Sequence, residues 1–132
     1  MRIALISCSK NKMVTECVAS KMYSKSTLFK KTLNYCHRQN YDLIFILSAK
    51  YGILNPSDKI LPYELTLNSF SKSELKIWAE QCYKILLPKY IESQFDFYAG
   101  KVYFKELSKL LPNSNNILEG LGIGERLKFL NQ

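Results

Sequence analysis

Three short apolar runs in the sequence are typical of buried β-strands. Residues 3–6 form a continuous apolar run, residues 43–47 are β-branched and aromatic, and residues 95–98 are interrupted by Asp96. Continuous runs of this length indicate strands that are covered on both faces, because a half-exposed strand would alternate between apolar and polar positions. We therefore expect three inner strands.

Helical patterns separate these runs. Apolar positions recur at helical spacing in three segments, residues 27–39, 101–111 and 124–130. A further helix should begin with the capping box that Ser71 and Glu74 form, and Pro88 should end it or lie in its last turn.

The order of strands and helices predicts an α/β fold with a mostly parallel sheet and helices on both faces. A chain of 132 residues that is 47% hydrophobic can close one core, so we expect a single compact domain over residues 1–132. Crossover connections should place the carboxyl ends of the strands at one edge of the sheet. Residues 50–70 are the longest irregular stretch, which should carry function or cover a pocket.

Charge narrows the range of partners. The 19 Lys and Arg against 11 Asp and Glu give a formal net charge of +8, which favours nucleic acid or nucleotide phosphates as partners. A lysine-rich surface that only maintains solubility is the alternative. No apolar run is long enough to span a membrane or to form a signal peptide. We therefore expect a cytoplasmic protein without a membrane partner, and the sequence leaves its oligomeric state open.

The cysteines do not form a recognisable framework. Cys8, Cys17, Cys36 and Cys82 show no C-x-x-C spacing, and the only histidine, His37, directly follows Cys36. We expect reduced, unpaired thiols, no metal site and no cofactor.

Hydroxyls and lysines gather where the first two strands end. Backbone N–H groups, serine hydroxyls and flexible ammonium groups at such positions suit a phosphate. The predicted phosphate-binding residues are Ser7, Ser9, Lys10, Lys12 and Lys50. No Walker motif is present, and a polar turn with solvated lysines is the alternative.

Aromatic residues and glycines near the same edge suit a base or a sugar. Tyr51 can stack on a base, or its ring can simply pack at the strand exit. The glycines that open the final helix can approach a ligand closely, although no strand follows them and a dinucleotide fold is therefore rejected. The predicted base- or sugar-binding residues are Tyr51, Gly52, Tyr63, Asn68, Gly120 and Gly122.

Three side chains are candidates for catalysis. Cys8 stands beside Lys10 and is either a nucleophile or a thiol that packs. Glu64 has apolar and aromatic neighbours in sequence, which would suit a general acid or base, and an ion pair with a lysine is its alternative. Glu119 should face the same pocket from the glycine-rich segment.

Four blocks of the sequence resemble a known family. They are SCSKxK at residues 7–12, LSAKYGIL at 47–54, PYxxTLN at 62–68 and LEGLGIG at 118–124. In this order they resemble a family of small, uncharacterised bacterial and phage proteins, known as a domain of unknown function. More distantly, the chain is similar to the YaaA family of peroxide-stress proteins and to the C-terminal region of archaeosine synthase. Those resemblances imply nucleic-acid or modified-base biology, but they do not imply a particular reaction.

These observations lead to two hypotheses of different classes. The first is a protein that processes a nucleotide or a nucleic-acid base at the carboxyl edge of the sheet, with cleavage or exchange of an N-glycosidic bond as the reaction to test. The second is a non-catalytic DNA- or RNA-binding module. A phage or host-defence protein that binds an acidic partner is a third alternative.

Overall fold

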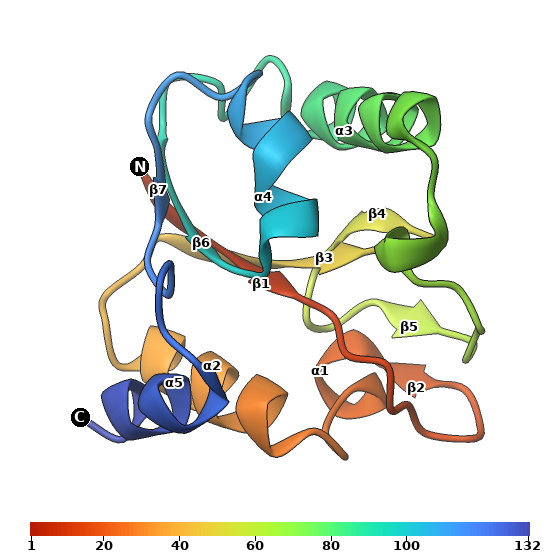
Figure 1. Cartoon of the computed structure of the whole chain (residues 1–132), viewed down its shortest axis with the longest axis vertical. Coiled ribbons are helices and arrows are strands. Elements are labelled where there is room, and N and C mark those ends of the chain that lie inside the picture. The colour runs from red at the N-terminus through yellow and green to blue at the C-terminus, as the bar shows by residue number, and fades with distance from the viewer.

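A five-stranded sheet forms the centre of the computed structural model, which describes all 132 residues. The strands are β1 (Arg2–Ser7), β3 (Leu43–Ser48), β4 (Gly52–Leu54), β6 (Gln94–Tyr98) and β7 (Ser114–Asn116), and their spatial order is β4-β3-β1-β6-β7 (Figure 1). β1 pairs in parallel with both β3 and β6, which confirms the predicted arrangement of these three strands. β7 is parallel to β6, and β4 is antiparallel to β3.

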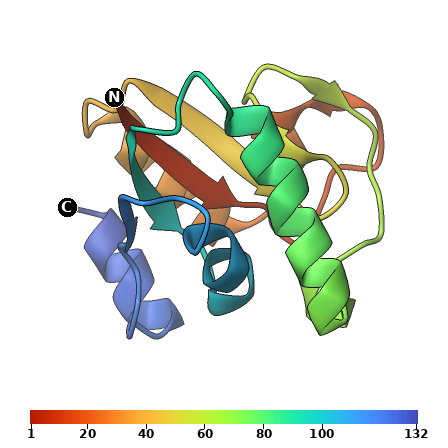
Figure 2. The ribbon, with the colours of Figure 1, turned by 90° about the horizontal axis from the view of Figure 1, so that it is seen from above.

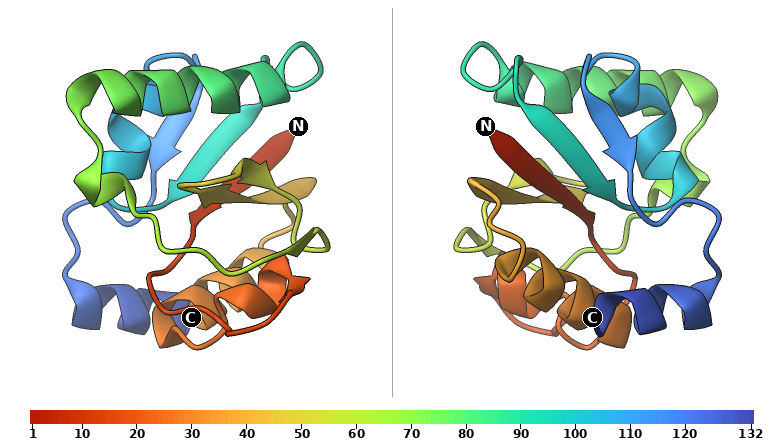
Figure 3. Two further views of the ribbon diagram at one scale, coloured as in Figure 1. Left: turned by 90° about the vertical axis from the view of Figure 1, so that its right-hand side faces the viewer. Right: turned by 90° about the vertical axis from the view of Figure 1, so that its left-hand side faces the viewer.

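Helices cover both faces of this sheet. α3 (Lys72–Leu86) and α4 (Lys101–Ser108) lie on one face, as Figure 2 shows from above. The short α1 (Ala19–Met22), α2 (Thr27–His37) and α5 (Ile123–Leu130) lie on the other, and the side views of Figure 3 separate the two layers. The predicted α/β class with a mostly parallel sheet in one compact domain is confirmed. No helix combines the length and the apolar character that crossing a membrane requires.

The apolar run of β1 is continuous because both of its faces are buried. Ile3 and Leu5 pack into the core under α3 and α4, whereas Ala4 and Ile6 pack into the core against α1, α2 and α5. All four side chains are at most 1% exposed. The alternation of side chains along a strand thus divides one apolar run between two cores.

Local sequence signals set the limits of α3. The Ser71 Oγ accepts a hydrogen bond from the Glu74 N–H at 3.2 Å, and the Glu74 Oε1 accepts one from the Ser71 N–H at 2.8 Å. This reciprocal capping box is the predicted one. The helix ends at Leu86, two residues before Pro88, as the sequence indicates.

The segment that we predicted to be irregular contains two short strands. Within residues 50–70, β4 continues the main sheet, and β5 (Lys59–Ile60) pairs antiparallel with β2 (Cys17–Val18) in a small separate sheet. Strands of two or three residues are too short to show periodicity in sequence, which explains why the pattern missed them. Gly52 turns the chain into β4 with φ of +76°.

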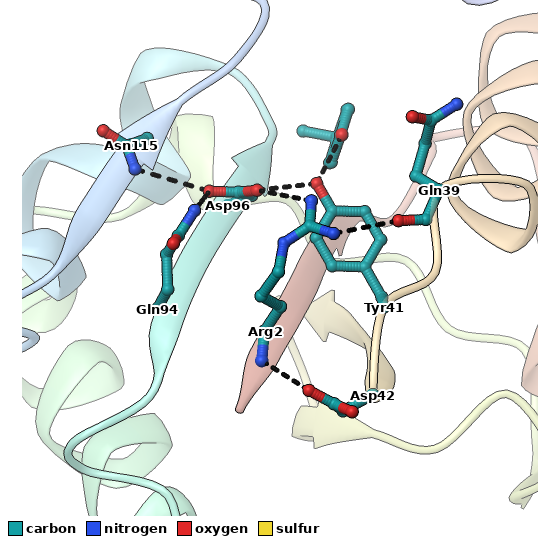
Figure 4. A network of polar contacts seen from close by, with 8 residues as sticks. Arg2, Gln39, Tyr41, Asp42, Gln94, Asp96 and Asn115 are labelled. Carbon is teal, nitrogen blue, oxygen red and sulfur yellow. Dashed lines mark hydrogen bonds and ion pairs between the residues drawn. The ribbon is translucent and has the colours of Figure 1, made fainter.

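A network of polar contacts joins the amino ends of the strands (Figure 4). The carboxylate of Asp96, a residue only 4% exposed, accepts hydrogen bonds from Tyr41 at 2.7 Å, Gln94 at 3.1 Å and Asn115 at 3.4 Å. The Arg2 guanidinium lies 3.9 Å from the same carboxylate. Because a buried carboxylate is costly without such partners, these contacts explain how the strand tolerates Asp96.

We predict that Gly52→Ala lowers the free energy of unfolding by about 1–2 kcal/mol, because an L-residue is strained at a positive φ. The neighbouring atoms, Cys82 Sγ and Ile85 Cδ1, would lie 3.6 Å from the added Cβ, so contact alone would not produce the loss. Urea unfolding measures it. Gly124→Ala is the control, since it adds a methyl group in open space at the start of α5, and an equal loss in the two variants would contradict the prediction.

Candidate functional site

A cavity of about 620 Å³ lies at the carboxyl edge of the sheet. Its walls come from residues 8–12, which follow β1, from residues 63–69, which precede α3, and from Tyr103 of α4. In open sheets of parallel strands, ligands bind beyond the carboxyl ends of the strands. The cavity therefore occupies the position at which the fold itself favours a site.

About half of the sequence-predicted site residues line this cavity. The structure brings together residues from the first and third sequence blocks, which are 50 positions apart or more. They are Cys8, Ser9, Lys10, Lys12, Tyr63, Glu64 and Asn68.

The Tyr63 hydroxyl is held in a buried polar cluster behind the cavity. Its oxygen lies 2.7 Å from the Tyr23 hydroxyl and 2.8 Å from the Ser48 Oγ. The Ser48 Oγ also accepts a hydrogen bond from the Tyr51 N–H at 3.0 Å. Two distant segments thus position the Tyr63 ring on the cavity wall.

The Cys8 thiol meets the edge of α4. Its Sγ lies 3.2 Å from the Tyr103 hydroxyl, and its backbone N–H donates to the Leu47 carbonyl at 2.9 Å. Burial, followed by the proximity of Cys8, raises the pKa of Tyr103, so this phenol stays protonated and can donate a hydrogen bond. His37 ends α2 and does not line the cavity.

The cationic groups of the cavity have no acidic partner. The protein contains two ion pairs, Arg2 with Asp96 and Lys109 with Glu106, and neither involves Lys10 or Lys12. The Lys12 Nζ donates to the Lys10 carbonyl at 3.2 Å and lies 4.5 Å from the centroid of the Tyr63 ring. Both ammonium groups therefore remain available to an anion.

Glu64 is exposed, although its apolar neighbours in sequence predicted a more enclosed carboxyl. It also forms no ion pair, which was the alternative. Glu64 thus lines the cavity and is open to solvent.

The predicted residues of the second strand end lie outside the cavity. Tyr51 packs edge-on against Tyr63 with 5.6 Å between ring centroids, and its hydroxyl donates to the Leu61 carbonyl at 3.3 Å. The Lys50 Nζ is exposed and lies 5.4 Å from the centroid of the Tyr51 ring. Gly52 is buried against α3. Tyr51 thus supports a wall of the cavity from behind.

The remaining predicted residues lie elsewhere. Ser7 lines a smaller cavity on the other side of β1, and Glu119 lines a groove beside α4. Gly120 adopts a φ of +80° in the turn before α5, and the Gly122 N–H donates to Glu125 Oε1 at 3.1 Å. These four residues do not join the large cavity.

Sequence reasoning missed Tyr23 and Tyr103 beside the cavity. It expected Ser48 at this edge, as the end of the second strand, but gave it no role. Tyr23 follows α1, a four-residue helix that has no sequence pattern of its own. Tyr103 follows the third strand by five positions, so its place near the strand end is the one signal that could have suggested it.

A separate hollow of about 670 Å³ lies at the amino edge of the sheet. The name 'large cavity' is kept for the cavity of about 620 Å³ at the carboxyl edge. The lining of the amino-edge hollow is almost entirely polar, and only one of its nine residues is apolar. The Arg2 N–H donates to Asp42 at 2.7 Å, and the Arg2 guanidinium lies 3.9 Å from Asp96, whereas Glu92 forms no ion pair. Ligand sites usually combine apolar walls with a few free polar groups. We therefore place the candidate site at the carboxyl edge. No group of three or more potential metal ligands occurs in the protein.

The tyrosine cluster predicts a loss of stability in alkaline solution. Burial raises the pKa of Tyr23 from 10.0 to about 12, whereas the unfolded chain releases this proton at the ordinary value. Because the folded pKa is the higher one, the contribution of Tyr23 to stability is complete below pH 10 and is lost as the pH rises toward 12. We expect Tyr23→Phe to reduce the fall in unfolding free energy across this window by roughly 2 kcal/mol at most. Urea unfolding at several pH values measures it, and an identical fall in variant and parent would contradict the assignment.

Comparisons with known proteins place the chain in a family without assigning it an activity. No match is found among curated proteins or among solved structures. A family model described as "Family of unknown function (DUF6884)" matches residues 3–132, which include every wall of the cavity. The chain is therefore a member of the DUF6884 family, a family of unknown function.

Proposed function

We propose that the protein acts in the cytoplasm on a nucleotide unit, free or within a nucleic acid, and hydrolyses its N-glycosidic bond in the cavity at the carboxyl edge. One observation carries the proposal: a single cavity presents two unpaired lysines, a carboxylate, a thiol and two tyrosine rings. The resemblance of the SCSKxK and LSAKYGIL blocks to the YaaA family and to archaeosine synthase supports a nucleic-acid or modified-base substrate.

The lysines suit the phosphate of such a unit. Lys10 and Lys12 lie in the segment that leaves β1, and Ser9 lines the same wall with its hydroxyl donating to the Asn11 carbonyl at 2.8 Å. A phosphate accepts charge-assisted hydrogen bonds, which are stronger than bonds between neutral groups. The Tyr63 ring beneath Lys12 provides an apolar surface for the sugar or the base.

The carboxylate and the phenol suit the bond cleavage. Glu64 accepts a proton from a water whose oxygen bonds to the anomeric carbon, while the carbon–nitrogen bond breaks and its electron pair leaves with the base. The hydroxyl of the water ends on the sugar, and the proton that Glu64 accepted passes to the leaving base, so Glu64 is regenerated and the reaction needs no other reactant. The negative charge of Glu64 also stabilises the positive charge that develops on the sugar. Tyr103 and Cys8 are hydrogen-bonded to each other, which leaves one proton of the pair to donate to the leaving base.

We predict that Lys10→Ala and Lys12→Ala each weaken the binding of nucleoside monophosphates by about tenfold to a hundredfold, since each removes a charged hydrogen bond. Calorimetry measures the affinity. Lys50→Ala and Lys84→Ala remove the same charge outside the cavity and should change the affinity less than about twofold. Equal losses in all four variants would contradict a defined phosphate site.

We predict that the parent protein releases free base from nucleoside monophosphates or from short DNA or RNA, and that Glu64→Gln does so at least about a hundredfold more slowly, because the amide cannot accept the proton of water. Chromatography of the reaction mixture detects the base. Glu119→Gln is the control, since its carboxylate lies in another groove. Binding without base release in the parent protein would reject the hydrolase.

A row of lysines on α4 favours a second candidate function, the non-catalytic nucleic-acid-binding module. Lys101, Lys105 and Lys109 follow each other at four-residue intervals and line a groove of about 340 Å³ that also contains Asn116 and Glu119. Four residues of helix advance by about 6 Å, so the row can follow successive phosphates of one strand. Lys109 is partly occupied by Glu106 at 3.3 Å.

Salt dependence tests this second candidate. If the row binds a strand, changing these three lysines to Gln should reduce the slope of log affinity against log salt for single-stranded DNA or RNA by about 2. The matched control changes the exposed Lys72, Lys76 and Lys84 of α3 to Gln and should change the slope by less than about 0.7. An equal reduction of the slope in both triple variants would mean that the lysines of the whole surface attract the strand, and it would contradict a defined binding row on α4.

A further inference from the structure

A second, smaller cavity lies on the other side of the end of β1. It has a volume of about 180 Å³, and its walls are mainly apolar, with Ile6 from β1, Phe29 from α2 and Leu118 from the segment before α5. Whereas the large cavity faces Tyr103 of α4, this one is enclosed by the helices of the opposite face. Neither the sequence blocks nor the family match assigns it a role.

One positive group without an acidic partner reaches this apolar space. Arg126 of α5 is half-buried, donates from its Nε to the Leu121 carbonyl at 2.8 Å and forms no ion pair. Its other guanidinium nitrogens thus remain free to donate hydrogen bonds. Arginine has donors and no acceptor, so a ligand must present acceptor atoms to it.

The two cavities share part of their walls just after β1. Cys8 and Ser9 are the residues that line both of them. A ligand that occupied both cavities would therefore have its central bond beside the Cys8 thiol. Its anionic end would lie among Lys10 and Lys12, and its other end would lie between α2 and α5.

We propose that the smaller cavity binds the planar ring of the substrate, and that this ring is a heterocycle with oxo groups on the edge that faces Arg126. This inference rests on the proposed function, because it assigns the base to one cavity and the sugar phosphate to the other. The size is suitable, since an apolar cavity of about 150 Å³ can hold a benzene ring. An exocyclic amino group would place a donor against the donors of Arg126, and it would therefore be disfavoured.

Separate probes for the two halves of the substrate test this assignment. The probes are ribose 5-phosphate for the large cavity and two matched pairs of free bases, uracil with cytosine and hypoxanthine with adenine, for the small one. Calorimetry with the parent protein should show that the oxo-base of at least one pair binds at least about tenfold more tightly than its amino counterpart, as expected for one charged hydrogen bond.

Variants should affect the two halves independently. Leu28→Trp enlarges a half-buried side chain on the wall of the small cavity and should weaken base binding at least about tenfold, with ribose 5-phosphate affected less than twofold. Lys10→Ala should weaken the binding of ribose 5-phosphate at least about tenfold and affect base binding less than about twofold. Arg126→Gln should remove the preference for the oxo-base, and Lys128→Gln on the same helix is its charge-matched control.

The outcomes separate the inference from the function on which it rests. If ribose 5-phosphate binding depends on Lys10, but no base binds or Leu28→Trp and Arg126→Gln leave base binding unchanged, the ring site is wrong and the phosphate site stands. If neither ribose 5-phosphate nor any base binds the parent protein, both proposals are wrong. Thermal unfolding of each variant verifies that it is folded. If Leu28→Trp does not fold, the result with Arg126→Gln decides.

Discussion

The parallel pairing of β1 with both β3 and β6 is the constraint on which the candidate site depends. It places the carboxyl end of β1 in the interior of the sheet edge, between the ends of two neighbouring strands. The backbone can hold this position because residues 3–6 are buried on both faces, so a shift of register would expose apolar side chains. Residues 8–12 leave the sheet at this point, and Cys8 and Ser9 line both cavities.

The two edges of the sheet differ in how their polar groups are satisfied. At the amino edge, Asp96 has hydrogen-bond donors from three residues and the Arg2 guanidinium nearby, which ties the starts of β1, β6 and β7 together (Figure 4). At the carboxyl edge, Lys10, Lys12 and Arg126 have no acidic partner. Structural charges are usually paired when they are buried, whereas unpaired cations beside a cavity can bind an anion or an acceptor. This contrast supports the carboxyl edge as the functional one.

The sequence predicted those features that depend on local patterns. Continuous apolar runs identified β1, β3 and β6, and the Ser71–Glu74 pair identified the start of α3, because burial on two faces and helix capping leave a direct trace in neighbouring residues. The same apolar run predicted where β1 ends, and the residues that follow it line the candidate cavity. The polar cluster was not predictable, since Tyr23, Ser48 and Tyr103 come from segments that are adjacent only in the folded chain. Lys50 was expected at the same pocket, but the chain reverses at Gly52 into the edge strand β4, and that reversal directs it away from the cavity.

Two-dimensional NMR of the 15N-labelled protein, titrated with inosine monophosphate, tests whether one ligand binds at the carboxyl edge of the sheet. This ligand carries both a phosphate and an oxo-heterocycle, so it should occupy the two cavities together. We expect shifts of the amide signals of residues 8–12 and 63–69 and of Ser7, Phe29 and Arg126, with little change at Asp96 and Asn115 of the amino edge. Shifts that spread over the lysines of α3 and α4, or that concentrate around Asp96, would contradict this expectation.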